Sequence, residues 1–444
     1  MKKQKLLFIT LLLFPICLIK ISGQVPVETT PQPSILAPNI KIGNPGDNVL
    51  TPGVPSSSGR KSRQPSNMYE RDRLETERRN TARQQIEENT PSSYKIQYEL
   101  PSQAGMQGTE HYYQAAKELL DMLNGKKELN LKDAIFLVEN AYFSGKLDRS
   151  KYEMSIINLV TIAQLKSKQE GYDWNNPITK NIMLFRAMAD TLTIKLPFRE
   201  NTEVSYPMQY DFEDFYGKKD YSKLFVSKLL ATHSGQCHSL PLLYLILCET
   251  TGTEACLAFS PEHSYIKFKD SRNNWYNLEL TQGRMVTDAF IIGSGFITTE
   301  AIKHGIYMKP QNRKQVIAHC LSDLASGYIH KYGYDKFAIQ CADSVLKYAP
   351  ENISALITKS NYYTFCFEYV VNQVGRPPKE VLKTHFPKVY ELMENRNNFY
   401  RKMDEMGFKE IPKDAYEHWL RSVNEEKMKR EHDFKYTKAL QLIK

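Results

Sequence analysis

One cysteine in this chain stands where a thiol can act as a nucleophile. Cys237 follows a Gly-Gln pair and precedes a long apolar segment in the stretch HSGQCHSLPLLYLILCE, residues 233–249. Unpaired N–H groups and the dipole at a helix N-terminus favour a thiolate over a thiol. Gly235 permits a tight turn into a helix, and Pro241 is least costly within the first helical turn. The spacing therefore predicts that Cys237 lies at the start of a buried helix.

A thiol nucleophile needs a neighbouring base and a group that orients this base. His263 opens the run HSYIKFK, so it is the candidate base. In the run NWYNLEL, alternation along a strand puts Trp275, Asn277 and Glu279 on one face. Glu279 or Asn277 could therefore accept a hydrogen bond from the second ring nitrogen of His263. These residues predict a catalytic triad of cysteine, histidine, and a carboxylate or amide.

The elements that must position these residues form one helix and several short strands. The run LPLLYLILCETTG is apolar nearly all round, which predicts a buried helix that ends at Gly252. The runs EACLAFSP, HSYIKFKD and WYNLELT are rich in β-formers, and SRNN supplies a turn between the last two. A buried helix followed by an antiparallel sheet predicts an α+β core, which we expect over residues 201–305.

The stretch from about 210 to 292 resembles the transglutaminase-like core of the papain-type superfamily. Three features carry this resemblance: GQC before an apolar helix, a histidine at the start of the next strand pair, and WYNLELT. The family typically has Trp, three residues, and then Asp-Pro-Thr. Counted from Trp275, the residues here are Glu279, Leu280 and Thr281. Glutamate thus replaces aspartate, which lengthens the reach to the imidazole by one methylene.

The resemblance implies a role for each candidate residue. Cys237 would be the nucleophile, His263 the base and Glu279 the third member of the triad. Gln236 would help to hold the oxyanion together with the backbone N–H of Cys237, and Trp275 would pack at the edge of the cleft. The helical segments before and after the core also resemble a bacterial branch of this family. The implied activity is hydrolysis of, or acyl transfer from, an amide in a protein or peptide.

Two other interpretations of this region stay open at the level of sequence. The replacement of Asp by Glu279, and Pro241 in the first helical turn, leave room for a degenerate domain that binds partners without catalysis. Zinc binding by His233, Cys237 and His238 is disfavoured, because adjacent residues diverge on a helix and no fourth ligand is well spaced. We therefore predict no metal site and no cofactor.

The N-terminal residues read as a targeting segment. Lysines at positions 2, 3 and 5 precede the apolar run LLFITLLLFPICLI, and ISG before Gln24 is a plausible cleavage site. Residues 1–23 are therefore predicted to be a signal peptide, and the mature protein to be periplasmic or secreted. Residues 24–66 are rich in Pro, Ser and Thr, which predicts a disordered linker. Six cysteines follow the predicted signal peptide without any CxxC pair, so no disulfide scaffold is expected.

Helical segments are predicted on both sides of the core. A helical lead-in is expected over 67–200, with apolar residues spaced by three and four in segments 111–123, 131–143, 149–169 and 177–192. The region 306–444 is predicted to be helical as well. Its run LSDLASGYIHKYGYDKFAIQCADSVLKYAP matches the thirty-four-residue tetratricopeptide-like helical repeat. Small alanines such as Ala338 and Ala342 would let paired helices approach, and Pro350 would end the second helix.

The charge of the chain narrows its range of partners. The net charge is +9, and four of these charges are lysines of the predicted signal peptide. The remaining excess is small and dispersed, which argues against nucleic acid as a partner. No stretch after the predicted signal peptide is apolar enough to span a membrane. A protein or peptide substrate is expected, and the helical repeats offer a surface for a protein partner.

Overall fold

The computed structural model describes residues 81, 96–197, 201–214, 216–295 and 297–409, together with four isolated positions, 421, 425, 428 and 429. The predicted signal peptide and linker lie outside these residues, and so does nearly all of the predicted helical region after residue 409. The described chain combines helices with an antiparallel sheet, so the mixed helix-and-sheet class is confirmed, and this class is compatible with an α+β fold.

In the described residues, four helices precede the predicted core, as the sequence indicates. They are α2 (Thr109–Leu123), α3 (Leu131–Tyr142), α4 (Arg149–Gln169) and α5 (Pro177–Ala189). Side-chain caps start three of them, because Asn130, Asp148 and Asn176 each accept a backbone N–H of the first turn. Helices α2 and α3 pack together, as do α4 and α5.

The helix predicted over 177–192 extends too far. It ends at Ala189, and a strand, β1 (Leu192–Lys195), follows and pairs antiparallel with β2 (Thr202–Ser205). The segment LTIK alternates apolar and polar residues and contains two β-branched side chains, so it fits a strand better than a helix. Its burial follows this period of two, with Leu192 and Ile194 buried. The lead-in over 67–200 is therefore not helical throughout.

The predicted buried helix is α7 (Ser239–Thr251). Every residue from Ser239 to Cys248 is buried, and Gly252 ends the helix in the left-handed conformation at φ 62°. Pro241 is the third residue of the helix, where its missing N–H leaves no internal bond unmade. These features confirm the helix start and end that the sequence indicates.

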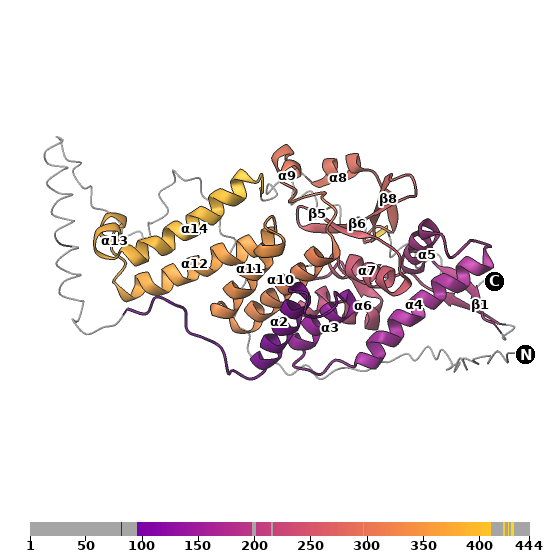
Figure 1. Ribbon diagram of the computed structural model, residues 1–444, viewed down its shortest axis with the longest axis horizontal. Coiled ribbons are helices and arrows are strands. Elements are labelled where there is room, and N and C mark those ends of the chain that lie inside the picture. The colour runs from indigo at the N-terminus through magenta and orange to yellow at the C-terminus, as the bar shows by residue number, and fades with distance from the viewer. Residues whose placement is uncertain are drawn as a thin grey trace, which may run out of the picture. The chain divides into compact units, whose positions relative to one another are not determined.

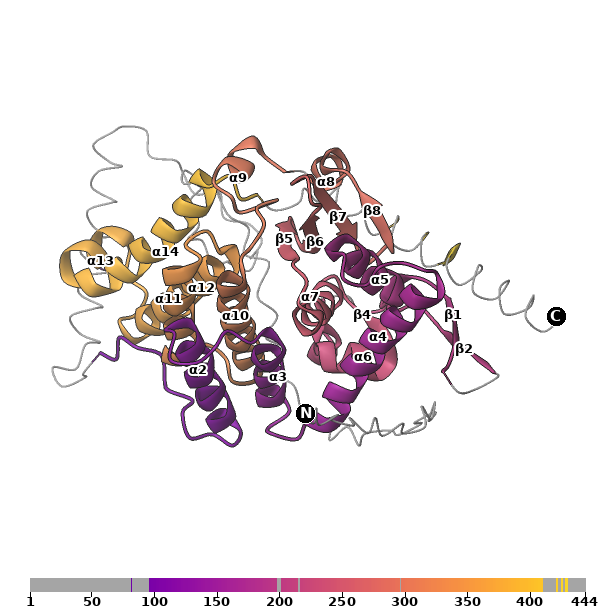
Figure 2. The same cartoon turned by 45° about the vertical axis from the view of Figure 1, so that its right-hand side comes forward.

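A four-stranded antiparallel sheet follows α7 in the chain (Figure 2). Its strands are β5 (Cys256–Ser260), β6 (His263–Lys269), β7 (Trp275–Glu279) and β8 (Arg284–Val286), in the spatial order of the sequence. The turn predicted at SRNN joins β6 to β7, and Asn273 there has φ 64°. Two short helices, α8 (Asp288–Gly295) and α9 (Thr299–Lys303), complete this part of the chain.

The remainder of the described chain is helical, as predicted. It contains α10 (Arg313–Tyr332), α11 (Lys336–Tyr348), α12 (Ile353–Gln373), α13 (Lys379–His385) and α14 (Pro387–Glu405). Helices α12 and α14 run side by side (Figure 1). Helix α11 packs against both α10 and α12, and its Ala338 and Ala342 are buried. The small residues thus lie at helix contacts, while the repeat family itself stays a prediction.

The main hydrophobic core joins α2–α5, α7, the sheet, α10 and α11. Tyr112 of α2 and Tyr328 of α10 are fully buried and meet edge to face at 5.5 Å. In this core, helices that precede and follow the sheet in the sequence pack with α7, the helix next to the candidate nucleophile. In the part of the chain that the structure describes, the six cysteines are free thiols, and no helix is both long and apolar enough to cross a membrane.

Candidate functional site

Cys237 lies directly before the N-cap of α7, which is His238. Two contacts hold it against the start of β6. The hydroxyl of Ser264 donates a hydrogen bond of 2.5 Å to the carbonyl oxygen of Cys237, and the Cys237 Sγ lies 3.8 Å from the carbonyl oxygen of Glu262. The thiol is partly exposed, unlike the fully buried Cys248 in the same helix. It is therefore accessible beside the strand that carries the candidate base.

The backbone before Cys237 is fixed by a short parallel pairing. Strand β3 (Gln209–Tyr210) pairs with β4 (Ser234–Gly235), and Gln236 N–H donates to Ser239 Oγ at 2.9 Å. A Cβ on Gly235 would lie 2.7 Å from that same hydroxyl oxygen. Glycine is thus required here for close packing rather than for a left-handed conformation. The GQC motif works as a tight entry to the helix, as the sequence predicts.

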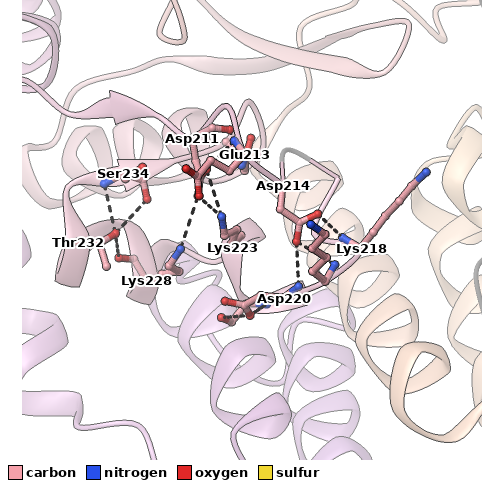
Figure 3. Close-up of polar contacts among 12 residues, drawn as sticks. Asp211, Glu213, Asp214, Lys218, Asp220, Lys223, Lys228, Thr232 and Ser234 are labelled. Carbon is pink, nitrogen blue, oxygen red and sulfur yellow. Dashed lines mark hydrogen bonds and ion pairs between the residues drawn. The ribbon is translucent and has the colours of Figure 1, made fainter. Parts of the chain in front are cut away.

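Asp211 anchors the segment beside Gln236. Its carboxylate pairs with Lys223 at 2.9 Å and with Lys228 at 3.7 Å, and both lysines point toward it (Figure 3). Its carbonyl oxygen accepts a hydrogen bond of 3.0 Å from Nε2 of Gln236. The Gln236 side chain is fully buried, and its Oε1 has no partner among the described residues. The Gln236 side chain is therefore fixed next to Cys237, with its Nε2 group donating to the carbonyl oxygen of Asp211.

His263 and Glu279 form a short side-chain pair at the site. Their Nε2 and Oε2 atoms are 2.6 Å apart, and the residue Glu279 is only 3% exposed. The other carboxylate oxygen accepts from the backbone N–H of Thr281 at 3.0 Å and from its hydroxyl at 2.7 Å. The β6–β7 register puts His263 and Glu279 diagonally across two neighbouring strands, on one face of the sheet.

The charges of this pair stabilise each other. Burial by itself lowers the pKa of His263, but the Glu279 carboxylate and a hydrogen bond with Cys237 raise this pKa well above its ordinary value. Burial favours a raised pKa for Glu279, but the ion pair with His263 and the hydrogen bonds from Thr281 hold it below its usual range. The Glu279 carboxylate therefore favours the protonated form of the His263 imidazole.

The hydrogen bonds of Asn277 and the ring contacts of Trp275 go to residues other than these three. Asn277 donates through Nδ2 to Asp288 Oδ1 at 2.8 Å and to the carbonyl oxygen of Val286 at 3.2 Å. Trp275 is 41% exposed at the opposite end of β7 from Glu279, where the Lys269 ammonium lies 4.7 Å from its ring centre. Each step of two residues along a strand moves a side chain by about 7 Å. A shared face therefore does not bring all three candidates to one histidine.

Two groups near Cys237 were not selected as site residues from the sequence. Burial raises the pKa of the Tyr210 hydroxyl, and the nearby Cys237 and Glu279 raise it further. This tyrosine lies near the thiol because β3 pairs with β4, and its place in the sequence alone does not reveal that pairing. The second group is a cluster of His238, His319 and Asp323, in which the last two are four residues apart on one helix. The sequence signal for this cluster was the i, i+4 spacing of His319 and Asp323, which puts both side chains on one face of a helix.

Comparison with models of known protein families, with curated proteins and with solved structures found no match. The assignment of a function to this protein therefore rests on the geometry of the chain's own residues.

Proposed function

We propose that the protein is an exported, transglutaminase-like thiol enzyme that cleaves or transfers the acyl group of an amide in a protein or peptide. The observation that carries this proposal is the 2.6 Å pair of His263 and Glu279, with Cys237 close enough to raise the pKa of the same imidazole. A cysteine at a helix start, a histidine and a carboxylate on adjacent strands provide a nucleophile, a proton carrier and an orienting group.

Each step of the proposed reaction uses a group in this arrangement. The thiolate of Cys237, paired with the protonated imidazole of His263, attacks the amide carbonyl carbon, and the resulting oxyanion accepts a hydrogen bond from the backbone N–H of Cys237. His263 then gives its proton to the leaving amine as the C–N bond breaks, which leaves a thioester on Cys237. Water or a second amine attacks the thioester, His263 takes up the proton, and the thiolate leaves. Glu279 keeps the imidazole oriented and stabilises its charge throughout.

Glutamate in place of the family's typical aspartate is compatible with this role. Glu279 reaches His263 with one oxygen while Thr281 holds the other oxygen by two hydrogen bonds. The extra methylene is thus accommodated without loss of the contact to the imidazole. A carboxylate fixed at both oxygens positions a histidine more firmly than one that rotates freely.

A thioester trap tests the proposal without knowledge of the natural substrate. The purified protein is incubated with a mixture of peptides and hydroxylamine, which converts an acyl-thioester into a hydroxamate that mass spectrometry detects. Wild-type protein should form hydroxamates, Cys237→Ser should not, and the matched control Cys256→Ser should retain the reaction. Failure of the folded wild-type protein to form any hydroxamate would contradict catalysis and favour a binding protein that uses the same surface around Cys237.

A further inference from the structure

A second cluster of chemically active side chains lies one residue from the candidate nucleophile. His238 is the N-cap of α7, and His319 and Asp323 lie one turn apart on α10. The Nε2 of His238 is 3.3 Å from Asp323 Oδ2, and the Nε2 of His319 is 3.7 Å from Asp323 Oδ1. One ligand atom from each of the three residues lies within 4.8 Å of the other two.

The separation of His238 from Asp323 matches the donor spacing around a transition metal. Zinc binds imidazole nitrogen and carboxylate oxygen at about 2.0–2.1 Å, so neighbouring donors of a tetrahedral site lie about 3.3–3.4 Å apart. The alternative is a metal-free cluster in which both imidazoles donate to Asp323, and an N–H···O bond would then be about 2.7–3.2 Å. The contact of His319 Nδ1 with Asn352 Nδ2, at 3.5 Å, favours that alternative only weakly. The 3.3 Å between His238 Nε2 and Asp323 Oδ2 equals the tetrahedral donor spacing, and His319 Nε2 lies 3.7 Å from the other carboxylate oxygen, so both separations are longer than an N–H···O bond.

The surroundings of the cluster also suit a cation. A cavity of about 250 Å³ adjoins it, lined on one side by apolar residues such as Leu242 and Phe225. Glu139 lines the same cavity, whereas none of the described residues that line it is a lysine or an arginine. Of the two carboxyl groups, Glu139 accepts from the backbone N–H groups of Val226 and Ser227, whereas Asp323 contacts the two imidazoles. The cavity leaves room for water to complete the coordination of an ion held by three protein ligands.

We propose that His238, His319 and Asp323 bind a divalent transition metal ion of the zinc type. Two imidazoles and one carboxylate are a donor set that such ions accept, whereas Ca²⁺ and Mg²⁺ prefer oxygen ligands alone. The ion joins the N-terminal turn of α7 to α10, two elements that are far apart in the sequence. Because His238 follows Cys237 directly, the ion also fixes the turn that presents the thiol. This proposal does not depend on catalysis by Cys237.

Zinc uptake by the purified full-length chain tests the proposal. The wild-type protein should retain one zinc per chain after dialysis and should melt at a higher temperature with zinc than after treatment with a chelator. His319→Ala and the isosteric Asp323→Asn should each weaken zinc binding by at least about tenfold and abolish the metal-dependent rise in melting temperature. Circular dichroism of the metal-free variants establishes that they are folded.

Two control variants separate this site from the rival ligand set of His233, Cys237 and His238. His233→Asn and Cys237→Ser should retain wild-type zinc affinity, since neither residue belongs to the proposed set. Co²⁺ in place of zinc should give a spectrum without a thiolate charge-transfer band. The proposal is overturned if the wild-type chain takes up no zinc, if Asp323→Asn binds it as tightly, or if Cys237→Ser loses it. Thiol chemistry measured in the same samples gives an independent readout of the proposed function.

Discussion

The substitution Glu279→Gln isolates the contribution of one carboxylate to the reactivity of Cys237. The variant keeps the length of the side chain but removes the charge that faces His263 at 2.6 Å. Without this charge, the raised pKa of His263 should fall, because burial then acts with less opposition. The imidazole would lose its proton near neutral pH, and a neutral imidazole stabilises the Cys237 thiolate less than an imidazolium.

The size of the effect follows from the geometry of the pair. A short contact between a nearly buried carboxylate and an imidazolium is a charge-assisted hydrogen bond, which contributes about 1.5–3 kcal/mol. Each 1.36 kcal/mol corresponds to a factor of ten, so alkylation of Cys237 by iodoacetamide at neutral pH should slow by about 10- to 150-fold. The rate is measured by mass spectrometry of the peptide that contains Cys237, at several iodoacetamide concentrations.

Glu262→Gln is the matched control for this experiment. Glu262 precedes His263, carries the same carboxylate on an exposed side chain, and contacts the hydroxyl of Tyr216. Its removal should change the alkylation rate by no more than about twofold, as expected for an exposed charge. Wild-type reactivity in a folded Glu279→Gln variant would refute the argument. Equal slowing in both variants would attribute the effect to general surface charge instead of the buried pair.

Further perturbations test the thiols, the helical packing and the ion pair. Iodoacetamide should modify Cys237 before the other five described thiols, because burial raises the pKa of each of those five. Peptide mass spectrometry of partly labelled protein gives the order of modification, and uniform slow labelling would contradict the prediction. Ala342 is 1% exposed, so the larger side chain of Ala342→Leu should overpack the core and lower the free energy of unfolding in urea by about 1–3 kcal/mol. An unchanged midpoint of urea unfolding would contradict the position of Ala342 at a helix contact. Asp335 is fully buried and its carboxylate accepts three hydrogen bonds, so Asp335→Ala should lower the free energy of unfolding by about 1–3 kcal/mol. Asp343 forms a half-exposed ion pair, so Asp343→Ala should lower it by less than about 1 kcal/mol. The stability lost in Glu279→Gln should be greatest between pH 4.5 and 6.5, the ordinary pKa values of Glu279 and His263. Because the pKa of Glu279 is lowered in the folded protein, the contribution of the pair is lost as the pH falls through that lowered pKa. Because the pKa of His263 is raised, the contribution is also lost as the pH rises through that raised pKa. A melting-temperature difference that does not vary with pH would contradict this assignment.

The sequence by itself determined the local elements of the site. The apolar run after Cys237, Gly235 before it and Gly252 at its end specify α7, because helix start, burial and termination depend on nearby residues. Period-two runs specify β5, β6 and β7 in the same way. The same local rule explains the one helix that was predicted too long, since the alternation that begins at Leu192 belongs to β1.

Tertiary structure decided which of these residues meet. Alternation left Glu279 and Asn277 equivalent as partners of His263, and the β6–β7 register together with the 2.6 Å contact distinguishes them. Strand register depends on pairing between segments, so it is not written in the periodicity of either strand.

The cluster around Asp323 shows the same limit over a greater distance in the chain. The spacing of His319 and Asp323 on one helical face is visible in the sequence, but His238 lies 81 positions before His319. Only the packing of α10 and α7 within the common core brings the three side chains together. Local periodicity therefore determined where each element begins and which face it buries. Contacts between distant elements decided the chemistry available to the protein, because these contacts depend on how the buried faces pack.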